Sequence, residues 1–250
     1  MTTNKKRIPE KLKNDAIVEA IVEIRFETST LPEIFYGRLL ECEAWKGFKQ
    51  IRMPAYDLPP SLRQSDPNLR YQPIFELQAP DKNRMLKVGA NVVSFHRLEP
   101  YEGWNTYRNE LDEVVNGLFN RTDNINITRI GLRYINAIRP ELHGISSLTE
   151  FDMKMSIENE DFSGGVNLNY INKHTEDLLS TVRVATTEFI QGNIPKGTFA
   201  LVDVDVYTPE AYKTSDSQQV KHWLESAHTE EKEQFFRLLT QETIDALEEK

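Results

Sequence analysis

Polar and apolar residues alternate most clearly in three stretches of the chain, at residues 16–27, 128–138 and 199–207. In each stretch apolar side chains occupy one face of an extended strand, and most charged side chains occupy the other. The charged positions are Glu19, Glu23, Arg25 and Glu27 in the first stretch, Arg129 and Arg133 in the second, and Asp203 and Asp205 in the third. Gly131 separates the two arginines. The pattern predicts three half-buried strands, each with one charged face.

Weaker patterns predict the remaining elements. Apolar residues at three- and four-residue spacing indicate helices at residues 34–45, 103–120, 218–227 and 230–249. Thr240, followed by Glu242 and Thr243, is a candidate start of a separate last turn or helix. Shorter apolar and alternating runs indicate strands at residues 71–78, 85–88, 91–97, 151–157, 166–171 and 181–190. Because most of these strands follow one another through short connections, we expect an α+β fold with mostly antiparallel sheets and a few packed helices.

The order of these elements suggests how the chain is divided. We expect a mobile N-terminal arm at residues 1–14, an α+β half at residues 15–140, and a second α+β half at residues 141–250 that ends in helices. This order permits a duplicated meander-plus-helix unit, although no sequence repeat is evident. One continuous domain is the alternative.

Composition narrows the classes of partner and compartment. The chain of 250 residues has 30 Lys and Arg against 39 Asp and Glu, a formal charge of -9, so it carries no global basic field that would attract nucleic acid. Nucleic acid is therefore not an expected partner. Cys42 is the single cysteine, and Glu19, Glu23 and Arg25 interrupt the first apolar run. We expect a cytoplasmic protein without a membrane span.

Sequence motifs of catalysis are lacking. The chain has no Walker A loop, no GxGxxG, no HExxH, no GxSxG and no CxxC, and its five histidines are scattered singly. The sequence therefore predicts no catalytic residue, no metal ligand set and no cofactor. The helical spacing of Trp104 and Tyr107 indicates core packing rather than a base-stacking platform.

The charged strand faces are the candidate ligand-binding site. The candidate residues are Arg25, Arg129, Arg133, Glu19, Glu23, Asp203 and Asp205. If the three strands are neighbours, these side chains line a polar groove in which guanidinium groups bind phosphate or carboxylate and carboxylates bind a divalent metal. If the faces are simply exposed, the same side chains form weak cross-strand ion pairs.

Parts of the chain resemble a sporadically distributed family of uncharacterised prokaryotic proteins. The resemblance lies in residues 14–26, in residues 101–104 before the predicted helix, in residues 129–136, and in the late strand at residues 202–205. A proline that is usual in the family near Asp15 and Ala16 is missing here. The patchy distribution resembles that of horizontally transferred genes, which include defence and toxin–antitoxin components; this is an analogy and implies no mechanism.

Taken together, these features favour a non-catalytic binding or regulatory module that acts through a partner protein. Arg25, Arg129 and Arg133 are the residues expected to contact that partner, because guanidinium forks match carboxylates. The alternative is a metal-assisted phosphohydrolase or nucleotide-binding protein whose polar groove uses the strand carboxylates as ligands. The two differ in whether those carboxylates converge on one point.

Overall fold

The computed structural model describes residues 6–10, 12–158, 160–161, 164–192 and 194–248. Nine of its strands are β1 (Ile17–Glu27), β2 (Lys49–Arg52), β3 (Phe75–Gln78), β4 (Arg84–Val88), β5 (Val92–Leu98), β6 (Asn126–Ile138), β9 (Asn167–Lys173), β10 (Leu179–Thr186) and β11 (Ala200–Tyr207). Its α-helices are α1 (Pro32–Leu40), α2 (Pro60–Ser65), α3 (Trp104–Arg121), α4 (Pro140–His143), α5 (Ser217–Arg237) and α6 (Gln241–Leu247). A separate two-stranded hairpin contains β7 (Ser156–Ile157) and β8 (Glu160–Asp161).

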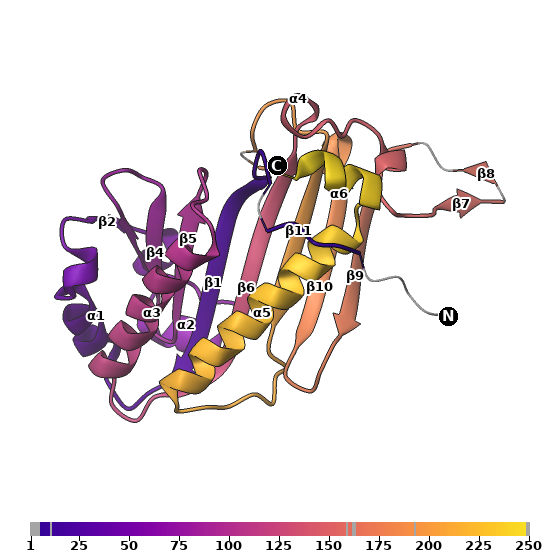
Figure 1. Cartoon of the computed structure of the whole chain (residues 1–250). Helices are drawn as coiled ribbons and strands as arrows, with labels where there is room; N and C mark the ends of the chain where they lie inside the picture. Colours follow the sequence, from indigo (N-terminus) through magenta and orange to yellow (C-terminus); the bar gives the residue numbers. More distant parts are fainter. Residues whose placement is uncertain (1–5, 11, 159, 162–163, 193, 249–250) are drawn as a thin grey trace.

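The nine strands form one antiparallel sheet with the order β2-β3-β4-β5-β1-β6-β11-β10-β9. The two long helices, α3 and α5, lie on the same face of this sheet, and α5 crosses β6 and β11 diagonally (Figure 1). We call this the helix face and the opposite one the outer face. The predicted α+β fold with a mostly antiparallel sheet is confirmed.

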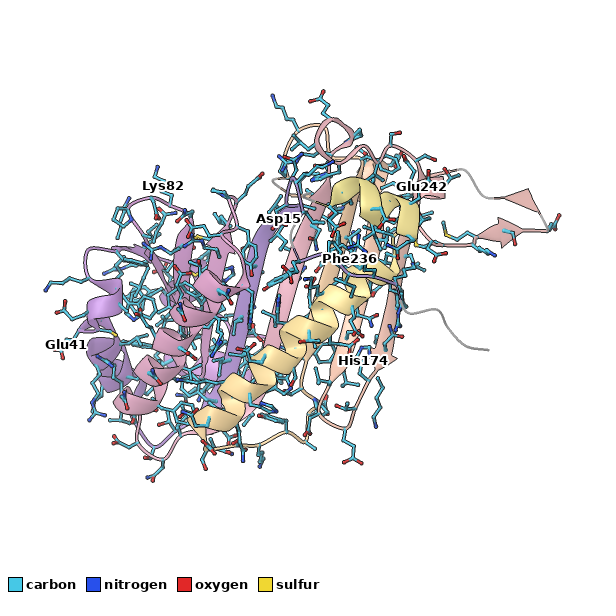
Figure 2. The ribbon with its side chains drawn as sticks, in the orientation of Figure 1. Asp15, Glu41, Lys82, His174, Phe236 and Glu242 are labelled. Atoms are coloured by element: carbon cyan, nitrogen blue, oxygen red, sulfur yellow. The ribbon has the colours of Figure 1, made fainter. Side chains whose placement is uncertain are left out.

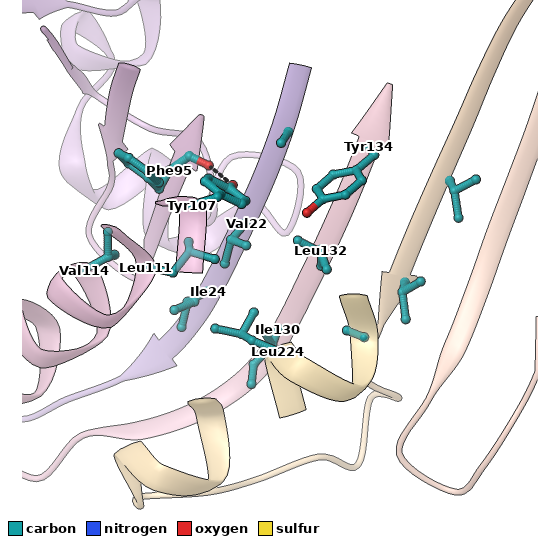
Figure 3. Close-up of a cluster of buried hydrophobic side chains, with 14 of the residues drawn as sticks. Val22, Ile24, Phe95, Tyr107, Leu111, Val114, Ile130, Leu132, Tyr134 and Leu224 are labelled. Atoms are coloured by element: carbon teal, nitrogen blue, oxygen red, sulfur yellow. Dashed lines mark hydrogen bonds between the residues drawn. The ribbon is translucent and has the colours of Figure 1, made fainter. Parts of the chain in front are cut away.

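The core lies between the sheet and its two long helices. The apolar sides of β1 and β6 are fully buried there, including Val22, Ile24 and Leu132, and α5 covers them with Leu224 (Figure 3). Tyr107 of α3 is 1% exposed and donates a hydrogen bond from its hydroxyl to the Phe95 carbonyl at 3.1 Å. This bond satisfies the one polar atom that the ring carries into the core.

Apart from β2 and α2 in the first half and β7, β8 and α6 in the second, the two halves of the chain repeat the same order of strands and α-helices. β1 is followed by α1, by the strands β3, β4 and β5, and by α3; β6 is followed by α4, by β9, β10 and β11, and by α5. β1 and β6 pair with each other at the centre of the sheet, so both halves contribute to one sheet and one core. The duplicated meander-plus-helix order is therefore present in the topology.

Two element predictions are wrong in detail. Residues 151–157 are not one strand, because Phe151, buried after a 3-10 turn, forms an isolated bridge with Leu239, and the strand covers only Ser156–Ile157. The last two helices also divide elsewhere: α5 is continuous through residues 228–229, and the break comes where the Thr240 hydroxyl accepts from the amide of Thr243 at 3.1 Å. Apolar spacing alone does not show where one helix ends and the next begins, whereas a capping side chain does.

The described part of the predicted N-terminal arm lies against the C-terminal helices. The Lys6 ammonium donates to the Leu239 carbonyl at 2.6 Å, Arg7 pairs with Glu248, and the Lys13 amide donates to the Leu247 carbonyl at 2.9 Å. Residues 1–5 and 11 of this arm lie outside the described residues. These contacts bring the start of β1 beside α5 and α6.

Candidate functional site

Strand order brings the seven sequence-predicted residues onto one surface. β6 lies between β1 and β11, and its register pairs Arg129 with Arg25, and Arg133 with Ile21 on one side and Asp205 on the other. Directly paired residues of an antiparallel sheet point to the same face. The charged side chains of all three strands therefore share the outer face, and we call them the outer-face network.

The strongest pair in the network joins Arg133 and Asp203. The guanidinium donates from Nε to Asp203 Oδ1 at 2.7 Å and from Nη2 to Oδ2 at 2.6 Å, which is a two-pronged pair. Asp203 is only 7% exposed, whereas the Arg133 side chain is 43% exposed. The hydrogen bonds to Asp203 raise the pKa of Arg133 above its ordinary value.

Gly131 makes room for the second pair. The Arg129 guanidinium lies across the glycine, with Nη1 2.9 Å from Glu23 Oε1 and Nη2 3.6 Å from Asp205 Oδ2. A Cβ at position 131 would come within 2.9 Å of Arg129 Nη1. The Arg-Gly-Arg spacing of the sequence thus has a structural reason: the missing side chain lets one arginine reach carboxylates on both neighbouring strands.

Further contacts extend the network toward β5. Arg25 donates from Nε to Glu23 Oε1 at 2.7 Å, and its guanidinium lies 4.5 Å from the centre of the Tyr71 ring. Glu19 Oε1 lies 2.7 Å from Nδ1 of His96, a residue that the sequence patterns did not single out. Burial raises the pKa of Glu19, but the bond to His96 and the charges of His96, Lys87 and Arg133 outweigh it, so this pKa is lowered.

Asp205 differs electrostatically from its neighbours. Burial raises its pKa to about 6, against the opposing charges of Arg129 and Arg133. Of the described residues, no group of three or more His, Cys, Asp or Glu is placed to hold a metal ion. The Arg129 guanidinium contacts Glu23 on one side and Asp205 on the other, so these two carboxylates share an arginine.

A second site lies on the helix face and was missed by the sequence patterns. It is a cavity of about 490 Å³ between the segment before β1, the start of α3 and the middle of α5. Figure 2 labels two residues of its lining, Asp15 in the segment just before β1 and Phe236 on α5. We call it the α5 pocket; its volume is in the range of small-molecule sites. One signal was present: Glu231 stands in the apolar stripe of its helix, four residues from both Ala227 and Phe235.

Aromatic and polar groups alternate in this pocket. The hydroxyls of Tyr101 and Tyr134 lie 2.8 Å apart, and the Tyr134 hydroxyl lies 3.4 Å from Nδ1 of His228. Trp104 stacks on the His228 ring with 4.1 Å between ring centres. Burial lowers the pKa of His228 to about 4, helped by the charge of Lys232, so this imidazole is neutral at pH 7.

Glu231 is the unusual residue of the α5 pocket. It is 3% exposed, and no hydrogen bond or salt bridge joins its carboxyl to another described residue. Burial raises its pKa well above the ordinary value; the Asp15 carboxylate adds to the rise, and Lys232 opposes it. A buried carboxyl without a partner is costly to ionise, so the structure favours its protonated form.

The comparisons with known proteins do not add to this geometry. No protein-family model matches the chain, and no curated protein matches it either. Of the helices described, none is long and apolar enough to cross a membrane. The family resemblance suggested by the sequence stays a prediction.

The raised pKa of Glu231 predicts a pH-dependent stability. A carboxyl whose pKa is higher in the folded state stabilises the fold fully below its unfolded pKa, and this contribution is lost as pH rises toward the folded pKa. As pH rises from 4 to 8, the wild type should therefore lose unfolding free energy relative to Glu231→Gln, because the variant has no carboxyl at this position. Each unit of pKa difference is worth about 1.4 kcal/mol.

Urea unfolding of both proteins at each pH measures this difference. Subtracting the two curves removes the contributions of groups common to both, including His228, whose lowered pKa has the opposite sign, and Asp205. A difference that stays constant from pH 4 to pH 8 would contradict the pKa assigned to Glu231.

Proposed function

We propose that the chain is a non-catalytic binding module of the cytoplasm that contacts a partner protein through the outer-face network. Arg133 carries this proposal. Asp203 holds one edge of its guanidinium, while Nη1 has no hydrogen-bond partner among the described residues and the side chain is 43% exposed. A side chain already held in place loses little conformational freedom when a partner binds. Arg133 is thus suited to accept a carboxylate from another protein.

The charge of the outer face supports an acidic partner segment. The chain as a whole is acidic, with a net charge of -9. On this face the register places slightly more cations than anions: Lys49, Lys87, Arg25, Arg129, Arg133, Arg183 and Lys173 against Glu76, Glu19, Glu23, Glu27, Asp203 and Asp205. Such a local reversal of sign favours encounter with negatively charged partners and disfavours self-association through the acidic remainder of the surface.

The alternative of a metal-assisted phosphohydrolase receives less support. That chemistry needs carboxylates that converge on one ion. In the outer-face network Glu19 bonds to His96, Asp203 bonds to Arg133, and Glu23 and Asp205 share Arg129. Each carboxylate contacts a basic side chain, which favours a role in positioning the arginines.

Quantitative affinity capture from the cytoplasm of the source organism tests the proposal. We compare the wild type with Arg133→Gln and Lys87→Glu on the outer face, and with Lys46→Glu as a control. The Lys46 side chain is 75% exposed, and among the described residues it pairs only with nearby Glu43. A partner that binds this face should be captured at least about tenfold less by both outer-face variants, since charged hydrogen bonds are worth about 1.5–3 kcal/mol. Lys46→Glu should retain it.

Two results would count against the proposal. One is a set of captured proteins that is the same for the wild type and the outer-face variants. The other is a loss that Lys46→Glu shares, because a control remote from the network would then behave like the test residues. Thermal unfolding of each variant confirms beforehand that it is folded at the temperature of capture.

A further inference from the structure

The α5 pocket combines an apolar wall with a buried acid. Its lining includes the aromatic rings of Tyr101, Trp104, Phe235 and Phe236, which come from two separate segments of the chain. Glu231 stands among them; the residue is 3% exposed, and its carboxyl has no hydrogen bond to any other described residue. Buried polar groups in folded proteins almost always have a partner, so this carboxyl calls for one.

The charged groups around the pocket show which sign that partner has. On the N-terminal segment the lining carries Glu10 and Asp15; on the loop before α3 it carries Glu102, which pairs with Arg97. Of the lining residues that the structure describes, Lys232 is the one cation, and His228 is neutral at pH 7 because burial lowers its pKa to about 4. Acidic groups therefore outnumber cations at this site, and a cationic ligand is favoured over an anionic one.

The aromatic rings favour the same class of ligand. Trp104, one face of which stacks on His228, and the tyrosines line the pocket, and aromatic rings attract an organic cation and also pack against an apolar body. The volume of about 490 Å³ accommodates a small organic molecule but not a folded partner. The outer-face network lies on the other side of the sheet, so this site is distinct from the one in the proposed function.

We propose that the α5 pocket binds a small organic amine, whose ammonium group pairs with Glu231 and whose apolar body packs against Trp104, Tyr101 and Phe235. The Tyr101–Tyr134–His228 hydrogen-bond chain forms the polar end of the wall beside it. Because Glu231 has no competing partner among the described residues, the ligand does not need to break an existing ion pair. This distinguishes the α5 pocket from the outer-face network, where each carboxylate already contacts a basic group.

Binding of an amine by this route has a proton signature. In the free protein burial favours the protonated Glu231, facing Asp15 and Glu10 of the N-terminal segment, Tyr101 and Glu102 of the loop, Tyr134 of β6, and His228 and Lys232 of its own helix. An ammonium ion beside Glu231 stabilises the carboxylate, so the proton leaves Glu231 and passes to the buffer. A neutral ligand in the same pocket releases no proton.

Isothermal titration calorimetry with 2-phenylethylamine and hexylamine tests this inference at pH 7. The matched ligands are 2-phenylethanol, which lacks the charge, and 3-phenylpropionate, which reverses it. Repeating the titration in two buffers of different ionisation enthalpy gives the number of protons released. We expect the amines to bind with proton release, and Glu231→Gln to weaken their binding at least about tenfold and abolish the release.

Glu113→Gln is the control, because it makes the same substitution at an exposed position of α3. It should bind the amines as the wild type does. Three results would overturn the proposal: no binding of either amine at millimolar concentration, equal binding of 2-phenylethanol, or unchanged amine binding by Glu231→Gln. The proton count on the wild type decides the question even if the variant does not fold, since amine binding without proton release also overturns it.

Discussion

Replacing Arg97 by Met should lower the free energy of unfolding by about 3–5 kcal/mol, the usual cost of removing one partner from a buried ion pair. Arg97 is on the helix face of β5 and is only 4% exposed. Its guanidinium donates from Nη1 to Glu110 Oε1 at 2.9 Å. Its Nη2 lies 2.7 Å from Oε2 of Glu102. Without it, Glu110 keeps only the longer contact to Arg84 at 3.5 Å.

The loss of unfolding free energy caused by Arg97→Met should depend on pH. Burial already raises the pKa of Glu110, against the charges of Arg97 and Arg84, and loss of Arg97 raises it further. Such a carboxyl stabilises the fold when protonated, below its unfolded pKa, and this contribution is lost as pH rises. The destabilisation should therefore be larger at pH 8 than at pH 4.

Urea unfolding of Arg97→Met, Glu110→Leu and the double variant measures the effect. The double variant should recover much of the loss, because it removes the buried carboxylate together with its partner. Two results would contradict this role of the buried pair. One is a loss of less than about 1 kcal/mol for Arg97→Met at pH 8. The other is a loss of unfolding free energy in the double variant that equals the sum of the losses in the two single variants.

Replacing Arg133 by Ala should cost about 2 kcal/mol, the second largest effect we expect. Asp203 is 7% exposed in the wild type, and the variant would leave it without both of its hydrogen bonds to Arg133. The figure is below that for a fully buried pair because the Arg133 side chain is 43% exposed and water screens it. Calorimetric or urea unfolding at pH 7 and low salt gives the value.

The matched control for Arg133 is Arg183→Ala. Arg183 is also on the outer face, directly opposite Asp203 in the register, but its guanidinium donates to Asn167 Oδ1 and to the Phe189 carbonyl. Because no buried carboxylate depends on it, its loss should cost about 0.5 kcal/mol. Equal effects at the two positions would contradict the special role of the Arg133–Asp203 pair, which also supports the proposed binding surface.

The sequence alone was enough to predict the strands that carry the outer-face network. Strand periodicity is a local property, since successive side chains point to opposite faces, so the alternation around Glu23, Arg133 and Asp203 identified both the strands and their charged sides. Apolar spacing misplaced the helix break near residues 228–229, whereas the capping residue Thr240, which is also a local signal, marks the start of α6. The binding function, its partner and the family resemblance stay predictions.

Only the tertiary structure decided which of these residues meet. Strand order and register are set by contacts between segments far apart in the chain. They bring Arg133 into hydrogen-bonding contact with Asp203, and they let Arg129 reach over Gly131 to bond with Glu23. The α5 pocket depends on them still more, because its lining comes from the N-terminal segment, the loop before α3, β6 and α5. Local patterns could mark Glu231 as a charge in an apolar stripe. The absence of a described partner for it follows from packing across the whole fold, which no local pattern encodes.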